Sequence, residues 1–496
     1  MIGTSSDSLC LIPKPLEVKL TGGRHVLKQS RAGDRSPRAL GFEVKLVLEQ
    51  TDDKTLGPEG YEVVVTPDRI TLRIPPHNKT ITGPGGKDVR VVGYDNRLYP
   101  ICTVEQLVRF NHRDGAIPCL VIRDKPRFPW RGFMLDSARH IQTVGFIEQI
   151  LDLMAGLKLN TFHWHLTDDT AWRIPIEKYP KLIEIGAWRN SGPNRYGGFY
   201  SREQIRHIIE YASERHISVI PEIEMPGHCN AALFAYPELS CAGTVWPTGA
   251  DGLDYFNAGG RRAFCASRPE TFAFLEDVLA EVMDLFDSPV IHIGGDERPH
   301  GVWSKCPRCQ QKMKELGLAD EHHLQRWFMQ QIVDFVHRSG RRTMAWSDGL
   351  REPFPQGQIV QGWHTGESEY TIASGSETVN SNNEFTYLDY PWSVESRKGK
   401  PDWMTFLLNT ETVYKFDPVP TGSTPEQAAR VRGGEAPLWT EVVPDDDTAF
   451  RQTFPRLIPF SEVAWSPPAG RNFPEFQRRL RPHVEHLKSI GVQCGE

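Results

Sequence analysis

The alternation of hydrophobic and polar positions changes character near residue 125. Residues 60–74 alternate apolar and polar side chains on both sides of a Thr-Pro-Asp turn, which predicts a β-hairpin. A helix is expected around residues 104–110, and another strand is expected around 118–123. We therefore predict a small α+β domain over residues 1–125, which ends at a linker broken by prolines.

After this linker, about eight short strand-like runs recur: residues 132–137, 161–166, 218–223, 290–293, 343–346, 358–363, 378–381 and 436–439. Apolar residues at helical spacing follow Phe146, and others follow Ser267-Arg-Pro-Glu270, which has the composition of a capping box. This alternation predicts an α/β fold, a (β/α)8 TIM barrel over residues 126–496, with an irregular crossover after Trp363. An open doubly wound sheet is the alternative, and the lack of a glycine-rich phosphate loop after an early strand disfavours it.

Composition and charge narrow the classes of function. Of the 496 residues, 39% are hydrophobic and 24% are charged, which is typical of a globular protein with a large core. The net charge of −6 supports neither nucleic-acid binding nor a basic membrane-binding face, and no apolar run approaches a membrane span. Met1–Leu16 lacks the pattern of a signal peptide, so we expect either a cytoplasmic protein or a mature exported form.

The nine cysteines are too sparse for a disulfide scaffold in a chain of this length. Cys306-Pro-Arg-Cys309 has the spacing of a zinc-binding pair, but zinc needs a second pair of ligands, and none is nearby in the sequence. The favoured interpretation is two thiols at the start of a helix. Cys241 and Cys265 flank a glycine-rich insertion, residues 244–260, and could form a disulfide if the protein lies outside the cytoplasm.

Polar and aromatic residues cluster where nearly every predicted barrel strand ends, and barrels of this kind carry their catalytic groups there. At one such end, Asp296-Glu297 follows Gly294-Gly295. Adjacent strand residues point to opposite faces, so both carboxylates can reach one pocket only where the glycines let the chain leave strand geometry. Repulsion between the two carboxylates favours one of them staying protonated near neutral pH. One acid beside one anion is what a glycosidase requires.

Several longer motifs, in order along the chain, resemble glycoside hydrolase family 20, the β-hexosaminidases, from about Arg131 to Trp465. The resemblance implies a retaining, exo-acting β-N-acetylhexosaminidase that removes terminal β-linked GlcNAc or GalNAc and uses the substrate's acetamide group as nucleophile, through an oxazolinium intermediate. It implies no cofactor and no metal in the site, and its expected partners are N-acetylhexosamine-terminated oligosaccharides or glycoconjugates. The motifs are Arg131-Gly-Phe-Met-Leu-Asp-Ser-Ala-Arg-His140, Phe162-His-Trp-His-Leu-Thr-Asp-Asp169, Pro221-Glu-Ile-Glu-Met-Pro-Gly-His228, His292-Ile-Gly-Gly-Asp-Glu297, Thr386-Tyr-Leu-Asp389 and Glu435-Ala-Pro-Leu-Trp-Thr-Glu441.

The resemblance also implies roles for individual residues. Glu297 would be the general acid/base, and Asp296 would hold the acetamide N–H and stabilise the charged intermediate. Tyr387 would donate to the acetamide oxygen, and Asp168 with His228 would support the acid/base carboxyl. The implied substrate-binding residues are Arg139, Asp389 and Glu441 for the sugar hydroxyls and Trp346, Trp363 and Trp439 for an aromatic box.

Three other functions stay open at this point. A glycosidase with an enzyme carboxylate as nucleophile would need a second carboxylate, and Asp389 or Glu441 could serve. A catalytically silent sugar-binding protein is disfavoured because Asp296, Glu297 and Tyr387 are all present. A zinc hydrolase lacks any pairing like HExxH. The remaining polar and aromatic residues of the motifs are expected to support the fold or to pack: His140, His165, Asp169, His163 and Trp164.

Overall fold

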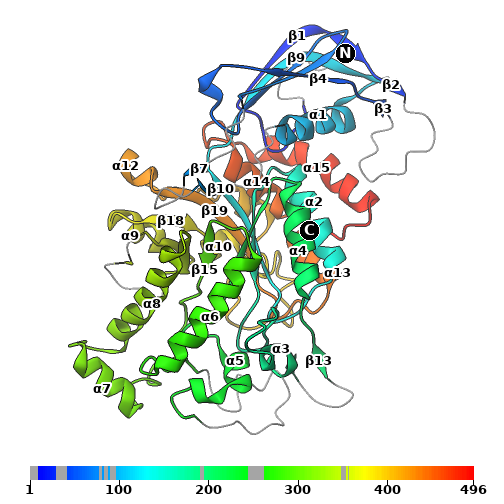
Figure 1. Cartoon of the computed structure of the whole chain (residues 1–496). Coiled ribbons are helices and arrows are strands. Elements are labelled where there is room, and N and C mark those ends of the chain that lie inside the picture. Colours follow the sequence, from blue (N-terminus) through cyan, green and yellow to red (C-terminus); the bar gives the residue numbers. More distant parts are fainter. Residues whose placement is uncertain are drawn as a thin grey trace.

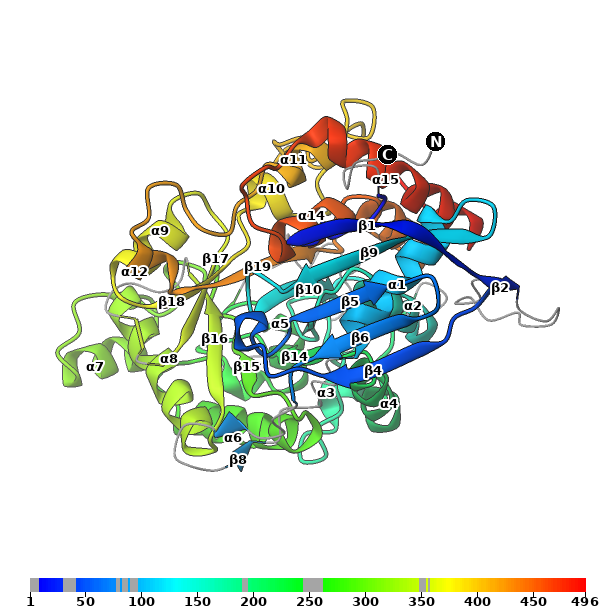
Figure 2. The ribbon, with the colours of Figure 1, turned by 90° about the horizontal axis from the view of Figure 1, so that it is seen from above.

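The computed structural model describes residues 9–29, 42–76, 81–82, 88–89, 97–189, 195–243, 262–347, 354–355 and 357–496. It contains a small mixed sheet stacked against one end of a closed parallel barrel (Figure 1). Seen from above, the strands of the small sheet lie side by side, with β1 and β4 at its two edges (Figure 2). No helix of the described residues is long and apolar enough to cross a membrane. The insertion at residues 244–260 lies outside the described residues.

Among the described residues, five strands form the small sheet in the order β1-β9-β5-β6-β4. Strands β5 and β6 pair antiparallel as the predicted hairpin, and the alternate residues Tyr61, Val63 and Val65 are buried. The predicted helix forms as α1 and starts earlier than expected, because Tyr99 also packs into the core of this sheet. The bounds are β1 Glu17–Val26, β2 Lys28–Gln29, β3 Phe42–Glu43, β4 Leu46–Gln50, η2 Lys54–Leu56, β5 Tyr61–Val65, β6 Ile70–Ile74, β7 Ile81–Thr82, β8 Asp88–Val89, α1 Leu98–Asn111 and β9 Ala116–Asp124.

In the described part of the chain, eight parallel strands close into a barrel, which confirms the predicted fold class. Each strand corresponds to one predicted run. The last strand begins earlier than predicted, because Gly433 allows a close approach: a Cβ at this position would lie 1.8 Å from the carbonyl oxygen of Trp130. The strands are β10 Trp130–Asp136, β11 Thr161–His165, β14 Ser218–Glu222, β15 Val290–His292, β16 Arg342–Trp346, β17 Ile359–Gly362, β18 Glu377–Asn380 and β19 Val431–Leu438.

The crossovers between the strands are helical early in the barrel and irregular late. The predicted capping box is wrong: helix α6 has Arg268 at its N-cap without a side-chain cap, and Pro269 takes the first helical position, where no N–H is needed. After Trp363, α9 is the short helix that leads into β18, as expected. The helices and remaining strands are α2 Val144–Gly156, α3 Lys181–Glu184, β12 Trp188–Arg189, β13 Tyr196–Gly197, α4 Arg202–Ser213, α5 Asn230–Ala235, η4 Pro237–Leu239, α6 Pro269–Leu285, α7 Pro307–Glu315, α8 Glu321–Arg338, α9 Glu367–Ala373, α10 Asn383–Thr386, α11 Thr410–Tyr414, α12 Pro425–Ala428, α13 Asp446–Thr453, α14 Leu457–Trp465 and α15 Phe473–Ser489.

Buried charges join the small sheet to the barrel. Arg131 Nη2 lies 2.8 Å from Glu59 Oε1, and Lys158 Nζ lies 3.1 Å from Asp124 Oδ2. The indole of Trp465 donates to the other oxygen of Asp124 at 3.0 Å. We propose that the chain divides into residues 1–125 and 126–496, in the connection between β9 and β10.

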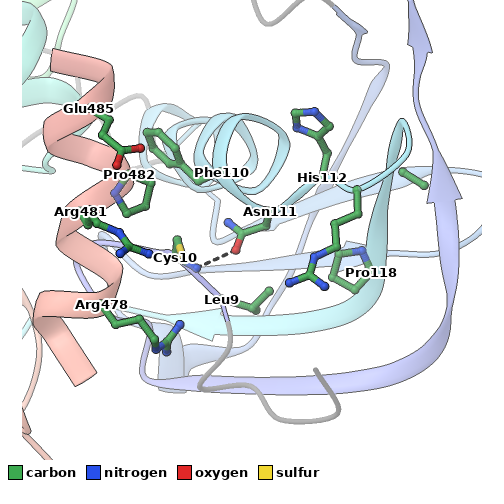
Figure 3. Close-up of a pocket in the computed structure, with 12 residues that line it drawn as sticks. Leu9, Cys10, Phe110, Asn111, His112, Pro118, Arg478, Arg481, Pro482 and Glu485 are labelled. Atoms are coloured by element: carbon green, nitrogen blue, oxygen red, sulfur yellow. Dashed lines mark hydrogen bonds between the residues drawn. The ribbon is translucent and has the colours of Figure 1, made fainter. Parts of the chain in front are cut away.

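The C-terminal helix α15 lies beside α1 (Figure 3). A cavity of about 410 Å³ separates parts of these two helices, with Phe110 on α1 and Arg478 and Pro482 on α15 among its lining residues. At its edge, the backbone N–H of Cys10 donates to Asn111 Oδ1 at 2.6 Å. This cavity is lined by the small domain and α15 rather than by the carboxyl ends of the barrel strands, so it is distinct from the candidate active site.

Candidate active site

A cavity of about 950 Å³ lies at the carboxyl ends of the barrel strands. Because parallel strands of a closed barrel all end at the same face, this is where side chains that are far apart in the sequence meet. Asp168 and Asp389 are fully buried and are not lining residues. The other predicted site residues line the cavity: Arg139, His228, Asp296, Glu297, Trp346, Trp363, Tyr387, Trp439 and Glu441.

Asp296 and Glu297 both reach this cavity because the chain leaves strand geometry after β15. Gly294 has φ +61° and Gly295 has φ +111°, the conformational freedom that the sequence predicts for the two glycines. Glu297 itself has φ +42°, an uncommon conformation for a residue with a side chain and one that is frequent at functional sites. The Asp296 side chain is 12% exposed and that of Glu297 is 37% exposed. Asp296 therefore lies deep in the cavity, whereas Glu297 lies nearer to solvent.

His228 contacts both carboxylates. Its Nε2 lies 3.5 Å from Asp296 Oδ2 and 3.4 Å from Glu297 Oε2, and its Nδ1 lies 3.4 Å from Asp168 Oδ2. Burial would lower the pKa of His228, but the carboxylates of Asp168 and Asp296 outweigh it and raise the pKa well above its usual value. Burial raises the pKa of Asp296, the charge of His228 opposes this rise, and Glu297 adds to it. A buried imidazolium thus balances the paired carboxyls.

Arg139 is held on the cavity wall by carboxylates. Its Nη2 lies 2.9 Å from Asp168 Oδ2 and 3.7 Å from Glu441 Oε1, and its Nη1 lies 3.3 Å from Asp136 Oδ2. Burial would raise the pKa of Asp168, but the charges of Arg139 and His228 bring it well below its usual range. Among the described residues Arg139 Nε has no hydrogen-bond partner, so this lining residue keeps a donor for a ligand. Arg139, Asp168 and His228 form a chain of alternating charge that leads to the carboxyl pair.

Aromatic rings form a continuous wall of the cavity. The ring centroids of Trp346 and Trp439 are 5.6 Å apart, those of Trp439 and Tyr387 are 6.2 Å apart, and those of Tyr387 and Trp363 are 6.1 Å apart with nearly parallel planes. The guanidinium of Arg139 lies 4.9 Å from the centroid of Trp439. Such rings offer a large apolar surface with little conformational entropy to lose, which suits the face of a sugar or a methyl group.

Asp389 is fully buried and is not among the residues that line the cavity. Neither carboxyl oxygen has a hydrogen-bond partner among the described residues. Burial, reinforced by the charge of Glu441, raises the pKa of Asp389 to about 8. A protonated Asp389 carboxyl can donate a hydrogen bond. We propose that Asp389 is a ligand of the sugar hydroxyls.

A buried network inside the barrel, centred on Glu222, was not predicted from the sequence. This carboxylate lies 3.0 Å from His163 Nε2 and 2.5 Å from His165 Nδ1, and it accepts the indole N–H of Trp346 at 2.7 Å. Burial opposes protonation of both histidines, yet Glu435 and Glu222 raise the pKa of His163 to about 9, and Glu222 raises that of His165 to about 10. His163, expected to be a packing residue, is therefore charged, and Glu222 fixes the orientation of Trp346. Alternate histidines on one strand beside a carboxylate on the next could have signalled this network.

Three groups of acids and histidines near this network have the spacing of metal ligands: His163, Glu222 and His292; His165, Glu222 and Glu224; and Asp168, Asp169 and His228. Each group contains a histidine whose pKa is raised by neighbouring carboxylates, so a metal ion would have to displace a proton from it. Arg139 also supplies a positive charge to Asp168 at 2.9 Å. These donor sets fit a network neutralised by the protein's own cations better than they fit a metal site.

Comparison with known proteins agrees with this geometry. A family model, Glycosyl hydrolase family 20, catalytic domain, matches residues 128–468. The chain is 37% identical to a β-hexosaminidase of Porphyromonas gingivalis over 76% of the chain, which is only 48% of that relative's length. It is 32% identical to a β-hexosaminidase of Akkermansia muciniphila over 84% of each protein.

Solved structures give the same result. A β-N-acetylhexosaminidase crystal structure has a TM-score of 0.82 and 28% identity, covering 98% of this chain and 97% of the other. A family 20 exo-β-N-acetylglucosaminidase from Vibrio harveyi, in complex with N-acetylglucosamine, has a TM-score of 0.81 and 28% identity, covering 98% of this chain and 78% of the other. Since the matched segment contains the whole barrel and all the predicted site residues, the chain belongs to glycosyl hydrolase family 20 and is a glycoside hydrolase.

Proposed function

We propose that the protein is a retaining, exo-acting β-N-acetylhexosaminidase that removes terminal β-linked GlcNAc or GalNAc from oligosaccharides or glycoconjugates. The observation that carries the proposal is the unequal placement of two adjacent carboxyls. Asp296 is 12% exposed and Glu297 is 37% exposed, in one cavity with Tyr387 and the aromatic wall. This placement suits a deep anion that acts on the acetamide group and an outer acid that reaches the leaving group.

In the proposed first step, the substrate's acetamide oxygen attacks the anomeric carbon as the glycosidic C–O bond breaks. Glu297 gives its proton to the departing oxygen, Asp296 accepts a hydrogen bond from the acetamide N–H, and Tyr387 donates to the acetamide oxygen. The negative charge of Asp296 offsets the positive charge of the oxazolinium. In the second step, Glu297 takes a proton from water, which attacks the anomeric carbon, reopens the ring and restores the β configuration.

The surrounding charges support this division of labour. His228 contacts both carboxyls through the same nitrogen and is itself held by Asp168, 3.4 Å from its other nitrogen. A positive charge at that position helps to keep Asp296 ionised against the effect of burial. A double displacement with Asp389 as nucleophile has less support, because Asp389 is fully buried and does not line the cavity.

The cavity continues past the aromatic wall to residues that could receive the rest of a glycan. Trp403 and Phe406 line it and are 50% and 36% exposed. Exposed rings beside a sugar pocket suit stacking against a second sugar. We therefore infer that the leaving group is itself a sugar, held on this side of the cavity.

The test is the release of p-nitrophenol from the β-GlcNAc, β-GalNAc and β-glucose glycosides. Because the acetamide group is the nucleophile, we expect turnover of one or both N-acetylated substrates and very little of the glucoside. A thiazoline analogue of the oxazoline should inhibit competitively. Turnover of the glucoside at a rate comparable with the N-acetylated sugars would refute substrate assistance, and no turnover of any of the three would refute the hydrolase proposal as stated.

A further inference from the structure

Four cysteines from distant parts of the chain converge outside the active-site cavity. Cys241 follows η4 and Cys265 precedes α6, whereas Cys306 is the N-cap of α7 and Cys309 lies in its first turn. All four sulfur atoms lie within 4.8 Å of one another, and three of the four residues are buried. The pair of ligands that Cys306 and Cys309 lack in the local sequence is thus supplied by the fold.

The sulfur spacing distinguishes a metal site from a disulfide. Cys309 Sγ lies 3.8 Å from Cys241 Sγ and 3.7 Å from Cys265 Sγ. Four thiolates at about 2.3 Å around a tetrahedral zinc ion are separated by about 3.8 Å, whereas the sulfurs of a disulfide are about 2.05 Å apart. All nine cysteines belong to the described part of the chain and have free thiols. We propose that Cys241, Cys265, Cys306 and Cys309 bind one structural Zn²⁺ ion.

The surroundings suit the charge of such a site. Four thiolates around Zn²⁺ carry a net charge of −2, and helix N-termini and guanidiniums stabilise anions. The sulfur of Cys309 lies at the N-terminus of α7. Arg308 donates to the carbonyl of Cys241 at 3.0 Å, and Arg268 donates to the carbonyl of Ser240 at 3.2 Å, so two cations border the cluster.

The zinc would join the two loops that carry the central catalytic groups. Cys241 and Cys265 belong to the segment between β14 and α6, which includes His228, and Cys306 and Cys309 end the segment after β15, which includes Asp296 and Glu297. The two loops also lie close together at the active site, where a Cβ at Gly227 would lie 3.2 Å from the carbonyl oxygen of Asp296.

A second contact between these loops lies nearer to the cysteines. The indole of Trp303, from the loop after β15, donates to the carbonyl of Phe264 at 2.9 Å, and the N–H of Phe264 donates to the carbonyl of Pro226 at 2.9 Å. The metal site therefore serves as a clamp that holds the loop of His228 against the loop of the carboxyl pair. It takes no part in bond making or breaking.

The experiment measures bound metal in the intact chain, produced in zinc-supplemented medium and purified without chelator. Elemental analysis should find about one zinc per chain in the wild type and in Cys119→Ser, a matched variant of a buried cysteine outside the cluster. In Cys309→Ser the bound zinc should fall at least about tenfold, since the substitution removes one of the four ligands. Its thermal midpoint should fall, whereas that of Cys119→Ser should fall less.

A second measurement does not depend on the folding of a variant. Titration of wild-type thiols with a mercurial, with a colorimetric indicator for free zinc, should release one zinc ion as the four clustered thiols react. Wild-type protein that binds no zinc under these conditions, or peptide mass spectrometry that finds a disulfide among the four cysteines, would overturn the proposal. Because neither readout uses glycosidase activity, failure of the zinc site and failure of the proposed function are distinguishable.

Discussion

At the scale of single residues, Asp296 and Glu297 are neighbours in sequence with different tasks, and substitution by the matching amide separates them. Asp296→Asn keeps the shape of the side chain but removes the negative charge that stabilises the oxazolinium. We expect kcat on the aryl GlcNAc glycoside to fall roughly a hundredfold or more, which corresponds to about 3 kcal/mol of transition-state stabilisation, while KM changes much less. Steady-state kinetics test this expectation, and a near-normal kcat would contradict the oxazolinium route.

Glu297→Gln should behave differently because general acid catalysis matters most for poor leaving groups. We expect a loss on the order of 10² to 10⁴ on oligosaccharides and a smaller loss on activated aryl glycosides. Azide should accelerate the slow second step of Glu297→Gln but should not rescue Asp296→Asn, since an external anion cannot position the internal nucleophile. Equal losses on both kinds of substrate would place the general acid at another residue.

At the scale of elements, the loop after β15 holds the carboxyl pair in place through Gly294. A Cβ at Gly294 would lie 1.8 Å from Glu224 Oε2 and 3.1 Å from Glu224 Cα, and the buried Glu224 side chain has little room to move. We expect Gly294→Ala to lower kcat/KM on the order of a hundredfold, because a shift of about 1 Å in a catalytic group has such an effect. Kinetics and thermal melting measure the two consequences.

The matched control for Gly294→Ala is Gly317→Ala. Gly317 has φ +65°, close to the φ of +61° at Gly294, but nothing lies within 4 Å of the position that its Cβ would take. The variant should therefore show only the backbone cost of a left-handed residue, about 1 kcal/mol of stability, with activity retained. Similar losses of activity in both variants would mean that the collision with Glu224 does not matter.

At the scale of the whole molecule, buried charges couple the small sheet to the barrel. Asp124 is 1% exposed and accepts hydrogen bonds from Tyr61, Lys158 and Trp465. Asp124→Asn would leave the Lys158 ammonium buried without its counter-charge, so we expect the free energy of unfolding to fall by about 3–5 kcal/mol. Denaturant unfolding measures this change, and kcat should stay close to the wild-type value because the interface lies away from the cavity.

The double variant Asp124→Asn/Lys158→Met tests the cause. If the unpaired charge is responsible, removing it should recover part of the lost stability. Equal stability of the single and double variants would instead assign the loss to the hydrogen bonds from Tyr61 and Trp465. Separate unfolding transitions for the two parts of the chain would show that this interface does not make their unfolding cooperative.

Local pattern was sufficient for the elements and for nine of the 19 residues that line the cavity. The barrel strands appear in the sequence as short apolar runs, and nearly every run ends in a polar or aromatic cluster. The position of Asp296 and Glu297 at a strand end therefore follows from the order of residues alone. The prediction of a capping box before α6 was wrong, because Arg268 is the N-cap, Pro269 is the first helical residue and no side chain caps the helix.

What the sequence by itself determined is therefore the type of fold, the family and nine of the cavity's lining residues, since these depend on periodicity and on motifs that are continuous in the chain. Only the tertiary structure decided which buried groups meet. Glu222 contacts His163, His165 and Trp346, which lie on two other strands. Cys309 lies beside cysteines that are 44 and 68 residues away in the sequence. The physical reason is that the chemistry of a buried charge or thiol depends on its neighbours in space. Barrel closure and loop packing bring those neighbours together from parts of the chain that share no local pattern.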